Sequence, residues 1–255
     1  MILLNKIFIF IFGTLIGSFL NVLIYRIPRR ISIIKPNSFC PNCHRPIRWY
    51  ENIPILSFIM LRGRCAGCRK RISIHYPLVE LITGLLLFYS YLHYQLSIQF
   101  FFYSFFFCSL IVISGIDFSH QVIPDFISIP GIVLGILLQI LTKNFLSGII
   151  GLGFGGGLIL LIRVFGGYVY KKEVMGLGDV FLTAMIGAFI GFPLIIPAIF
   201  IASLVGALFG LLYIKATHQT RDVPIPFGPF LGVGGILALL FRSQILSLLF
   251  CIGHP

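Results

Sequence analysis

Eight runs of apolar residues follow one another along the chain, and only one long polar segment interrupts them. Most of the runs approach the length of a helix that crosses the hydrocarbon core of a bilayer, which takes about 20 residues. The sixth run is the shortest, and it ends near Pro193. The runs cover residues 2–25, 78–93, 98–116, 126–142, 148–167, 180–192, 194–214 and 227–250. The pattern predicts an all-α polytopic membrane protein with about eight transmembrane helices.

The first run and the polar segment after it suggest the domain organisation. Lys6 followed by apolar residues resembles a signal peptide, but no small-residue cleavage site follows, so we expect a retained transmembrane helix. Residues 26–77 are polar and rich in Arg, Pro and Cys, and they are the only segment large enough for a separate soluble module. The expected parts are a first transmembrane helix at 1–25, a loop domain at 26–77 and a membrane-embedded core at 78–255.

Composition and charge fit this picture and add an orientation. The chain is 58% hydrophobic and 10% charged, with a mean hydropathy of +1.04. Its net charge of +12 could suggest nucleic acid, but the positive-inside rule explains the distribution of the bases better. With eight spans, fifteen bases fall on the side of the 26–77 loop and three, Lys6, Lys143 and Arg242, on the other. We therefore expect a cytoplasmic loop domain, both termini outside, lipid as a partner and no nucleic acid.

Four cysteines of the loop domain have the spacing of a zinc site. Cys40 and Cys43 form one CxxC motif, Cys65 and Cys68 form another, and 21 residues separate the two. In a reducing cytoplasm such pairs favour zinc over a disulfide. Four thiolates leave no open coordination position, so the metal is expected to be structural. The alternative is a set of unliganded or redox-active thiols. The single Cys108 and Cys251 are expected to be inert.

Two other features receive structural interpretations. The stretch GLGFGG at 151–156 matches a dinucleotide-binding pattern, but no strand precedes it, so we expect its glycines to let neighbouring helices approach closely. Arg163 lies near the end of the same run and is expected to extend toward the membrane surface. No HExxH or GxSxG motif is present for metal-dependent or serine hydrolysis.

The seven acidic residues of the chain are few enough to consider singly. Asp117 ends the third predicted span and Asp179 begins the sixth, which places both at one cytoplasmic level. Two carboxylates in a shared site can activate water and polarise a peptide carbonyl, and Gly176 and Gly178 would let a substrate backbone approach Asp179. The residues alone are equally compatible with a proton or ion relay, or with helix capping by Asp179 and Asp125.

Six motifs in order make the chain resemble the type IV prepilin peptidases, which are membrane aspartic proteases of the GxGD class. The motifs are GSFLNVLIYRIP at 17–28, the paired CxxC motifs, ISIHYPLVELITG at 72–84, IDFSHQVIPD at 116–125, GLGDV at 176–180 and PFGPFLG at 226–232. The family pattern continues GxGDxK, whereas Phe181 occupies the Lys position here. This departure bears on rate and substrate preference more than on the type of reaction.

The resemblance implies a function for most of these features. Asp117 and Asp179 would be the catalytic pair of a peptidase core at 78–255, and Asp125 would support them. The substrates would be prepilins and pseudopilins, whose basic leader is cut at the cytoplasmic face of the bacterial inner membrane. Relatives of this kind commonly methylate the new N-terminus with S-adenosylmethionine. Glu80 is a candidate participant in that second reaction, although stabilisation of a helix N-terminus explains it equally well.

Two other classes of protein remain as alternatives. A proton-coupled transporter could use Asp117 and Asp179 as a relay, and a presenilin-type intramembrane protease shares the GxGD motif. Neither class accounts for a cytoplasmic loop with four cysteines. A relay should also continue with polar residues across the membrane, yet Thr183 is the only such residue between 180 and 201.

Overall fold

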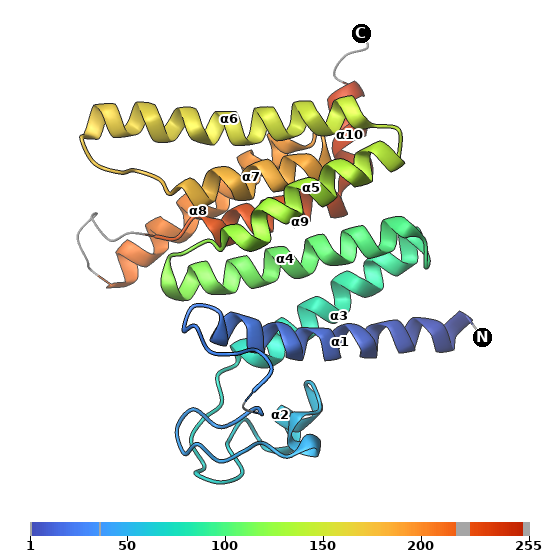
Figure 1. Ribbon diagram of the computed structural model, residues 1–255, viewed down its shortest axis with the longest axis vertical. Coiled ribbons are helices and arrows are strands. Elements are labelled where there is room, and N and C mark those ends of the chain that lie inside the picture. The colour runs from blue at the N-terminus through green and yellow to red at the C-terminus, as the bar shows by residue number, and fades with distance from the viewer. Residues whose placement is uncertain (1, 36, 218–224, 252–255) are drawn as a thin grey trace. The chain divides into compact units, whose positions relative to one another are not determined.

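The computed structural model describes residues 2–35, 37–217 and 225–251, and within them every regular element is a helix (Figure 1). The elements are α1 (Ile2–Arg26), the short 3₁₀ helix η1 (Trp49–Asn52), α2 (Leu56–Met60), α3 (His75–Tyr94), α4 (Ile98–His120), α5 (Asp125–Leu141), α6 (Phe145–Tyr170), α7 (Leu177–Ile190), α8 (Ile195–Thr217), α9 (Gly228–Leu240) and α10 (Arg242–Cys251). The prediction of an all-α membrane protein is confirmed, and each of the eight apolar runs is helical.

The count of eight spans is not confirmed. Among the described residues, four helices are long and apolar enough to cross a membrane: α1, α4, α6 and α8. The helices α5 and α7 are apolar but shorter, with 17 and 14 residues. The run 227–250 is not one helix, because α9 and α10 are bent by 79° at the break between them. The polar residues Arg242, Ser243 and Gln244 follow this break.

The chain divides into two compact units, Met1–Val112 and Ile113–Pro255. In the first unit α1 and α3 lie side by side (Figure 1), and small residues bring their backbones together. A Cβ added at Gly17 of α1 would lie 2.7 Å from the Cα of Glu80 in α3. The loop between these two helices holds the four cysteines as well as η1 and α2.

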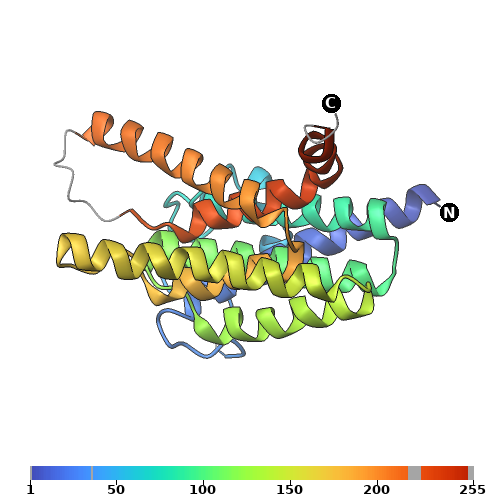
Figure 2. The same ribbon diagram turned by 90° about the horizontal axis from the view of Figure 1, so that it is seen from above.

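The second unit is built around α7, which is enclosed by other helices. Every residue from Leu182 to Ile190 is buried, and a helix that is apolar on all sides is expected in such a position. The helices α5 and α6 lie on either side of α7 in Figure 1, and α6 lies over α7 in the view of Figure 2. Both helices contact α7, as does α9. The glycine-rich stretch of α6 has the predicted role, because a Cβ at Gly151 would lie 2.9 Å from the Cα of Gly191, just past the end of α7. The packing continues toward the N-terminal turn of α7, which carries Asp179, because a Cβ at Gly156 would lie 3.0 Å from the Cβ of Ala184.

Candidate functional site

Asp117 lies in the last turn of α4, where the start of α9 binds it. Its side chain is buried, with 5% of its surface exposed. The backbone N–H of Gly228, the first residue of α9, donates to Oδ2 of Asp117 at 2.9 Å. A Cβ at Gly228 would lie 2.6 Å from that oxygen, so only glycine allows this approach. The N-terminus of a helix favours a negative charge, and α9 therefore stabilises the Asp117 carboxylate.

Asp179 lies in the first turn of α7 and uses one of its two carboxylate oxygens as a cap. The N–H of Gly176 donates to Oδ2 at 3.2 Å, which is the capping role that the sequence left open. The other oxygen, Oδ1, is buried and has no hydrogen-bond partner among the described residues. A buried polar atom without a partner is unfavourable and calls for an explanation. Capping thus explains Oδ2 of Asp179 and leaves Oδ1 available for chemistry.

The structure brings Asp117 and Asp179 together within the second unit. The two carboxylates are close enough for the charge of one to act on the other. The connection between α4 and α5 closes one side of this arrangement, because a Cβ at Gly178 would lie 2.6 Å from the Cβ of Ile123. In this structure Ile123, rather than a substrate backbone, takes the space beside Gly178. Neither Gly228 nor Ile123 was singled out from the sequence, although both lie in the motifs quoted for the resemblance.

Other predicted residues of this unit lie around the pair or outside the described part. Asp125 is the first residue of α5, in its first turn, and is exposed. Arg163, expected to extend toward the membrane surface, reaches the segment that follows the end of α6 at Tyr170. Its guanidinium donates to the carbonyl of Met175 at 3.1 Å and pairs with Glu173, so it holds the segment that leads into Gly176. Phe181 is half-buried, and Asp222, expected in a cytoplasmic loop, lies outside the described residues.

The four cysteines of the loop form two knuckles with the same backbone pattern. In each knuckle the first cysteine donates its N–H to the carbonyl five residues later, and the residue four positions on returns its N–H to the cysteine carbonyl. These residues are Cys40, His44 and Arg45 in one knuckle and Cys65, Arg69 and Lys70 in the other. His44 and Arg69 both have a positive φ, of 56° and 61°. The two turns thus aim two pairs of thiols at a common point.

The geometry of the thiols fits one tetrahedral metal ion. The Sγ atoms of Cys40, Cys43, Cys65 and Cys68 all lie within 4.8 Å of one another, and those of Cys40 and Cys68 are 3.9 Å apart. A tetrahedral zinc with bonds of about 2.3 Å requires sulfur atoms about 3.8 Å apart. The four cysteines could therefore hold a metal ion.

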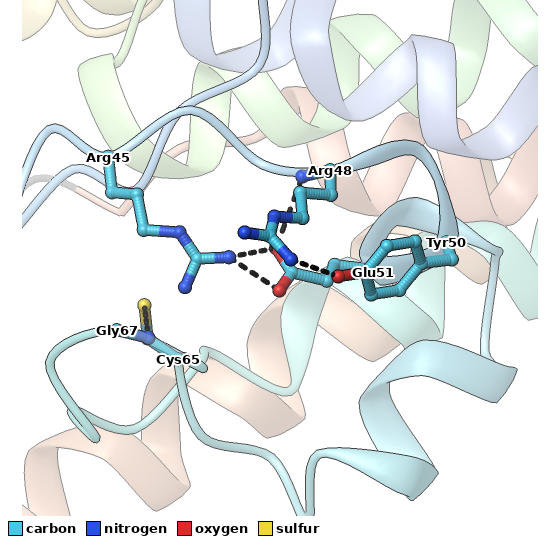
Figure 3. Close-up of polar contacts among 6 residues, drawn as sticks. All are labelled: Arg45, Arg48, Tyr50, Glu51, Cys65 and Gly67. Atoms are coloured by element: carbon cyan, nitrogen blue, oxygen red, sulfur yellow. Dashed lines mark hydrogen bonds and ion pairs between the residues drawn. The ribbon is translucent and has the colours of Figure 1, made fainter.

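An ion pair braces the first knuckle. Glu51 accepts two hydrogen bonds from the guanidinium of Arg45, the longer at 2.6 Å, and one from the backbone N–H of Arg48 at 3.1 Å (Figure 3). The N–H of Arg48 and the charge of Arg45 hold the pKa of Glu51 below its usual range. Figure 3 also shows the N–H of Gly67 donating to the sulfur of Cys65. Glu51 is thus a neutralised carboxylate with a structural role in the loop.

Glu80 differs from Glu51, although both belong to the first unit. Glu80 is buried, with 8% exposed, and its Oε2 accepts the N–H of Ile55 at 2.8 Å. It does not lie in the first turn of α3, so stabilisation of the helix N-terminus, the alternative weighed from the sequence, does not explain it.

Comparison with known proteins finds matches to both the part of the chain with the two aspartates and the part with the four cysteines. A family model described as Type IV leader peptidase family matches residues 104–211, which include both aspartates. A model described as Bacterial Peptidase A24 N-terminal domain matches residues 11–94, which include the four cysteines and Glu80. A relative from Myxococcus xanthus, named prepilin leader peptidase/N-methyltransferase, is 37% identical over 235 residues, or 89% of this chain and 70% of the relative.

The chain belongs to the type IV leader peptidase family.

Further relatives with the same printed name match almost from end to end. The one from Legionella pneumophila is 33% identical and covers 93% of this chain and 91% of its own length. The one from Pseudomonas aeruginosa is 35% identical, with coverages of 91% and 89%. No solved structure matches the chain. Membership of the type IV leader peptidase family confirms the resemblance and does not favour the transporter or presenilin-type alternatives.

Proposed function

We propose that this protein is a membrane aspartic endopeptidase that removes the basic leader of type IV prepilins and pseudopilins. One observation carries the assignment of the residues. Oδ1 of Asp179 is buried without a hydrogen-bond partner among the described residues, and the charge of Asp117 acts on the same carboxylate. In such a pair one carboxylate takes a proton from water while the other, protonated, polarises the scissile carbonyl. The relatives that carry the name prepilin leader peptidase support this substrate class.

The residues around the pair have distinct supporting roles in this proposal. The N–H groups of Gly228 and Gly176 each bind one oxygen and fix the orientation of the two carboxylates. Asp125 is exposed at the start of α5, and its charge is available to the basic residues of a leader. Gly178 and Ile123 hold the first turn of α7 against the α4–α5 connection. The expected peptidase core thus gathers its site at the ends of α4, α7 and α9.

A second activity, methylation of the new N-terminal residue, rests on the relatives that are named N-methyltransferases. It requires a methyl donor, for which we propose S-adenosylmethionine. The donor supplies an electrophilic methyl group to the free amine. Its binding site is expected in the part of the chain that matches the N-terminal family model, residues 11–94.

For the metal we propose one structural zinc ion held by Cys40, Cys43, Cys65 and Cys68. The spacing of the four sulfur atoms supports this choice, and four thiolates complete a tetrahedral zinc shell. The loop domain at 26–77 has little apolar core of its own, and a metal compensates for that. The protein is proposed to lie in the bacterial inner membrane with this loop and the aspartate pair on the cytoplasmic side.

A direct test combines purified full-length protein in detergent with a synthetic prepilin peptide, with and without S-adenosylmethionine. We expect a single cut after the glycine that ends the leader, and a mass increase of one methyl group on the product when the donor is present. A peptide that stays intact under conditions in which a known relative cuts it would refute the peptidase function. A cut product that never gains a methyl group would refute the second activity alone.

A further inference from the structure

The first unit contains a cavity of about 390 Å³, a volume typical of sites for small organic ligands. Its walls come from α1, from the cysteine loop and from the start of α3. The lining includes aromatic rings, among them Tyr25, Phe39, Phe58 and Tyr76. The charged residues of the lining are the carboxylates Glu51 and Glu80 and the bases Arg26, Lys70 and Arg71. Aromatic faces together with side chains of both charges suit a ligand that carries a positive charge and a negative one.

Glu80 is the lining carboxylate that still lacks a cation. Glu51 is neutralised by Arg45, whereas no described basic side chain forms an ion pair with Glu80. Its hydrogen bonds come from neutral groups, the N–H of Ile55 and the hydroxyl of Ser18. A buried carboxylate near the end of an apolar helix is unfavourable unless it has a function or a partner. A cationic ligand in the cavity would be that partner.

The backbone around Ile55 shows that the carboxylate is held in place. Ile55 has φ 63° and ψ −52°, and the N–H of Leu56 donates to the carbonyl of Pro54. This is a γ-turn, which is strained for a β-branched residue. The turn directs the N–H of Ile55 at Glu80, so a strained conformation is retained where it fixes a carboxylate on the cavity wall.

We propose that this cavity binds S-adenosylmethionine and that Glu80 holds its sulfonium cation. The inference rests on the proposed methyl transfer and names the site for that reaction. The adenine ring suits the aromatic part of the lining, and Arg71, which also lines the cavity, can pair with the carboxylate of the donor. Glu80 acts on the donor through its charge, because the donor is a cation at sulfur and the demethylated product, S-adenosylhomocysteine, is a neutral thioether.

This difference in charge provides a test that does not depend on activity. The dissociation constants of S-adenosylmethionine and S-adenosylhomocysteine are measured by equilibrium dialysis on full-length protein in detergent. Glu80→Gln keeps the shape and the hydrogen bonds but removes the charge. It should weaken donor binding by about 10-fold or more and change product binding by less than about 2-fold. Glu173→Gln, the same change at an exposed carboxylate of the second unit, should alter neither constant.

Prepilin cleavage on the same preparations reports folding, because Glu80 has no role in the proposed peptidase site. A second variant, Val22→Trp, fills the cavity from α1 and should abolish binding of both compounds while cleavage persists. Equal weakening of donor and product by Glu80→Gln would show a merely structural role and overturn the proposal. Unchanged donor affinity in both variants would also overturn the proposal, provided that the wild-type protein cuts and methylates prepilin. Binding of phosphate or anionic lipid at this cavity without binding of the donor would also overturn it.

Discussion

At the scale of single residues, the carboxylates of this protein differ in how completely they are paired, and this difference separates structural from chemical roles. Glu51 accepts its hydrogen bonds from two arginines and belongs to the loop structure. Asp117 and Asp179 each accept one backbone N–H, and Oδ1 of Asp179 is left without a partner among the described residues. Burial without full pairing is unfavourable for stability, and the most direct explanation is a reaction that uses the free oxygen.

The contact between Gly178 and Ile123 yields a prediction about the position of Asp179. Gly178→Ala places a Cβ about 2.6 Å from that of Ile123, so the first turn of α7 must shift. We expect the kcat/KM for prepilin cleavage to fall at least about 10-fold, because small displacements of a catalytic group are costly. Ile123→Ala in the same chain removes the obstacle and should restore most of the rate. A Gly178→Ala protein with unchanged cleavage would show that this contact does not position Asp179.

At the scale of elements, close helix packing sets the position of α7. Its 14 residues span about 21 Å, less than the hydrocarbon thickness, and neighbouring helices enclose it. Glycines allow these neighbours to approach, as helix interfaces in membranes require. The GLGFGG stretch of α6 is therefore a packing surface rather than a nucleotide site.

Two glycines of α6 provide a matched test of this packing. A Cβ at Gly151 would lie 2.5 Å from the carbonyl oxygen of Gly187 in α7, whereas a Cβ at Gly153 meets nothing within 4 Å. Gly151→Ala should destabilise the protein by about 1–3 kcal/mol through overpacking. Gly153→Ala should be neutral or stabilise it by up to about 1 kcal/mol, because alanine favours helix. Thermal unfolding in detergent measures both, and equal effects of the two changes would contradict the packing.

The two cysteine knuckles form the other element with a testable role. Replacing any one of Cys40, Cys43, Cys65 or Cys68 by Ser should release zinc, measured by metal analysis of the purified protein, since each thiolate is one of four ligands. Cys108→Ser, a control outside the cluster, should keep one zinc per chain. Cleavage should decline only through lower stability, because the aspartates lie in the other unit. Active wild-type protein that contains no metal would contradict this role.

At the scale of the whole molecule, the basic residues predict the orientation in the membrane. With eight crossings, the N-terminus and Pro255 lie outside and the 26–77 loop lies in the cytoplasm. Pro255 is outside the described residues, so this prediction needs reporter fusions along the chain. A cytoplasmic signal from a fusion at Pro255 would mean an odd number of crossings. The bend of 79° between α9 and α10 is the place where such a difference would most readily arise.

Local patterns in the sequence predicted the helices and the cysteine cluster, whereas the pairing of Asp117 with Asp179 came from the count of spans and from the family resemblance. Neither source predicted the contacts that complete the site. Apolar periodicity and CxxC spacing are properties of neighbouring residues, and each predicted run became helical. The bond from Gly228 to Asp117 joins residues 111 positions apart. No local pattern specifies such a pairing, because it depends on how α9 packs in the second unit. The same reason applies to Ile123 beside Gly178 and to the loop contacts of Arg163.

The central claim is that Asp117 and Asp179 together activate water, and their replacement by Asn tests it most directly. Asn keeps the size and most hydrogen bonds of each side chain but cannot ionise, so the pair loses its base or its shared proton. The measurement is kcat/KM for cleavage of a prepilin peptide by correctly inserted, zinc-containing protein. Asp117→Asn and Asp179→Asn should each lower it by about 1,000-fold or more. Asp125→Asn and Asp222→Asn should retain substantial activity. Near wild-type cleavage by either of the first two variants would contradict the aspartate-pair mechanism.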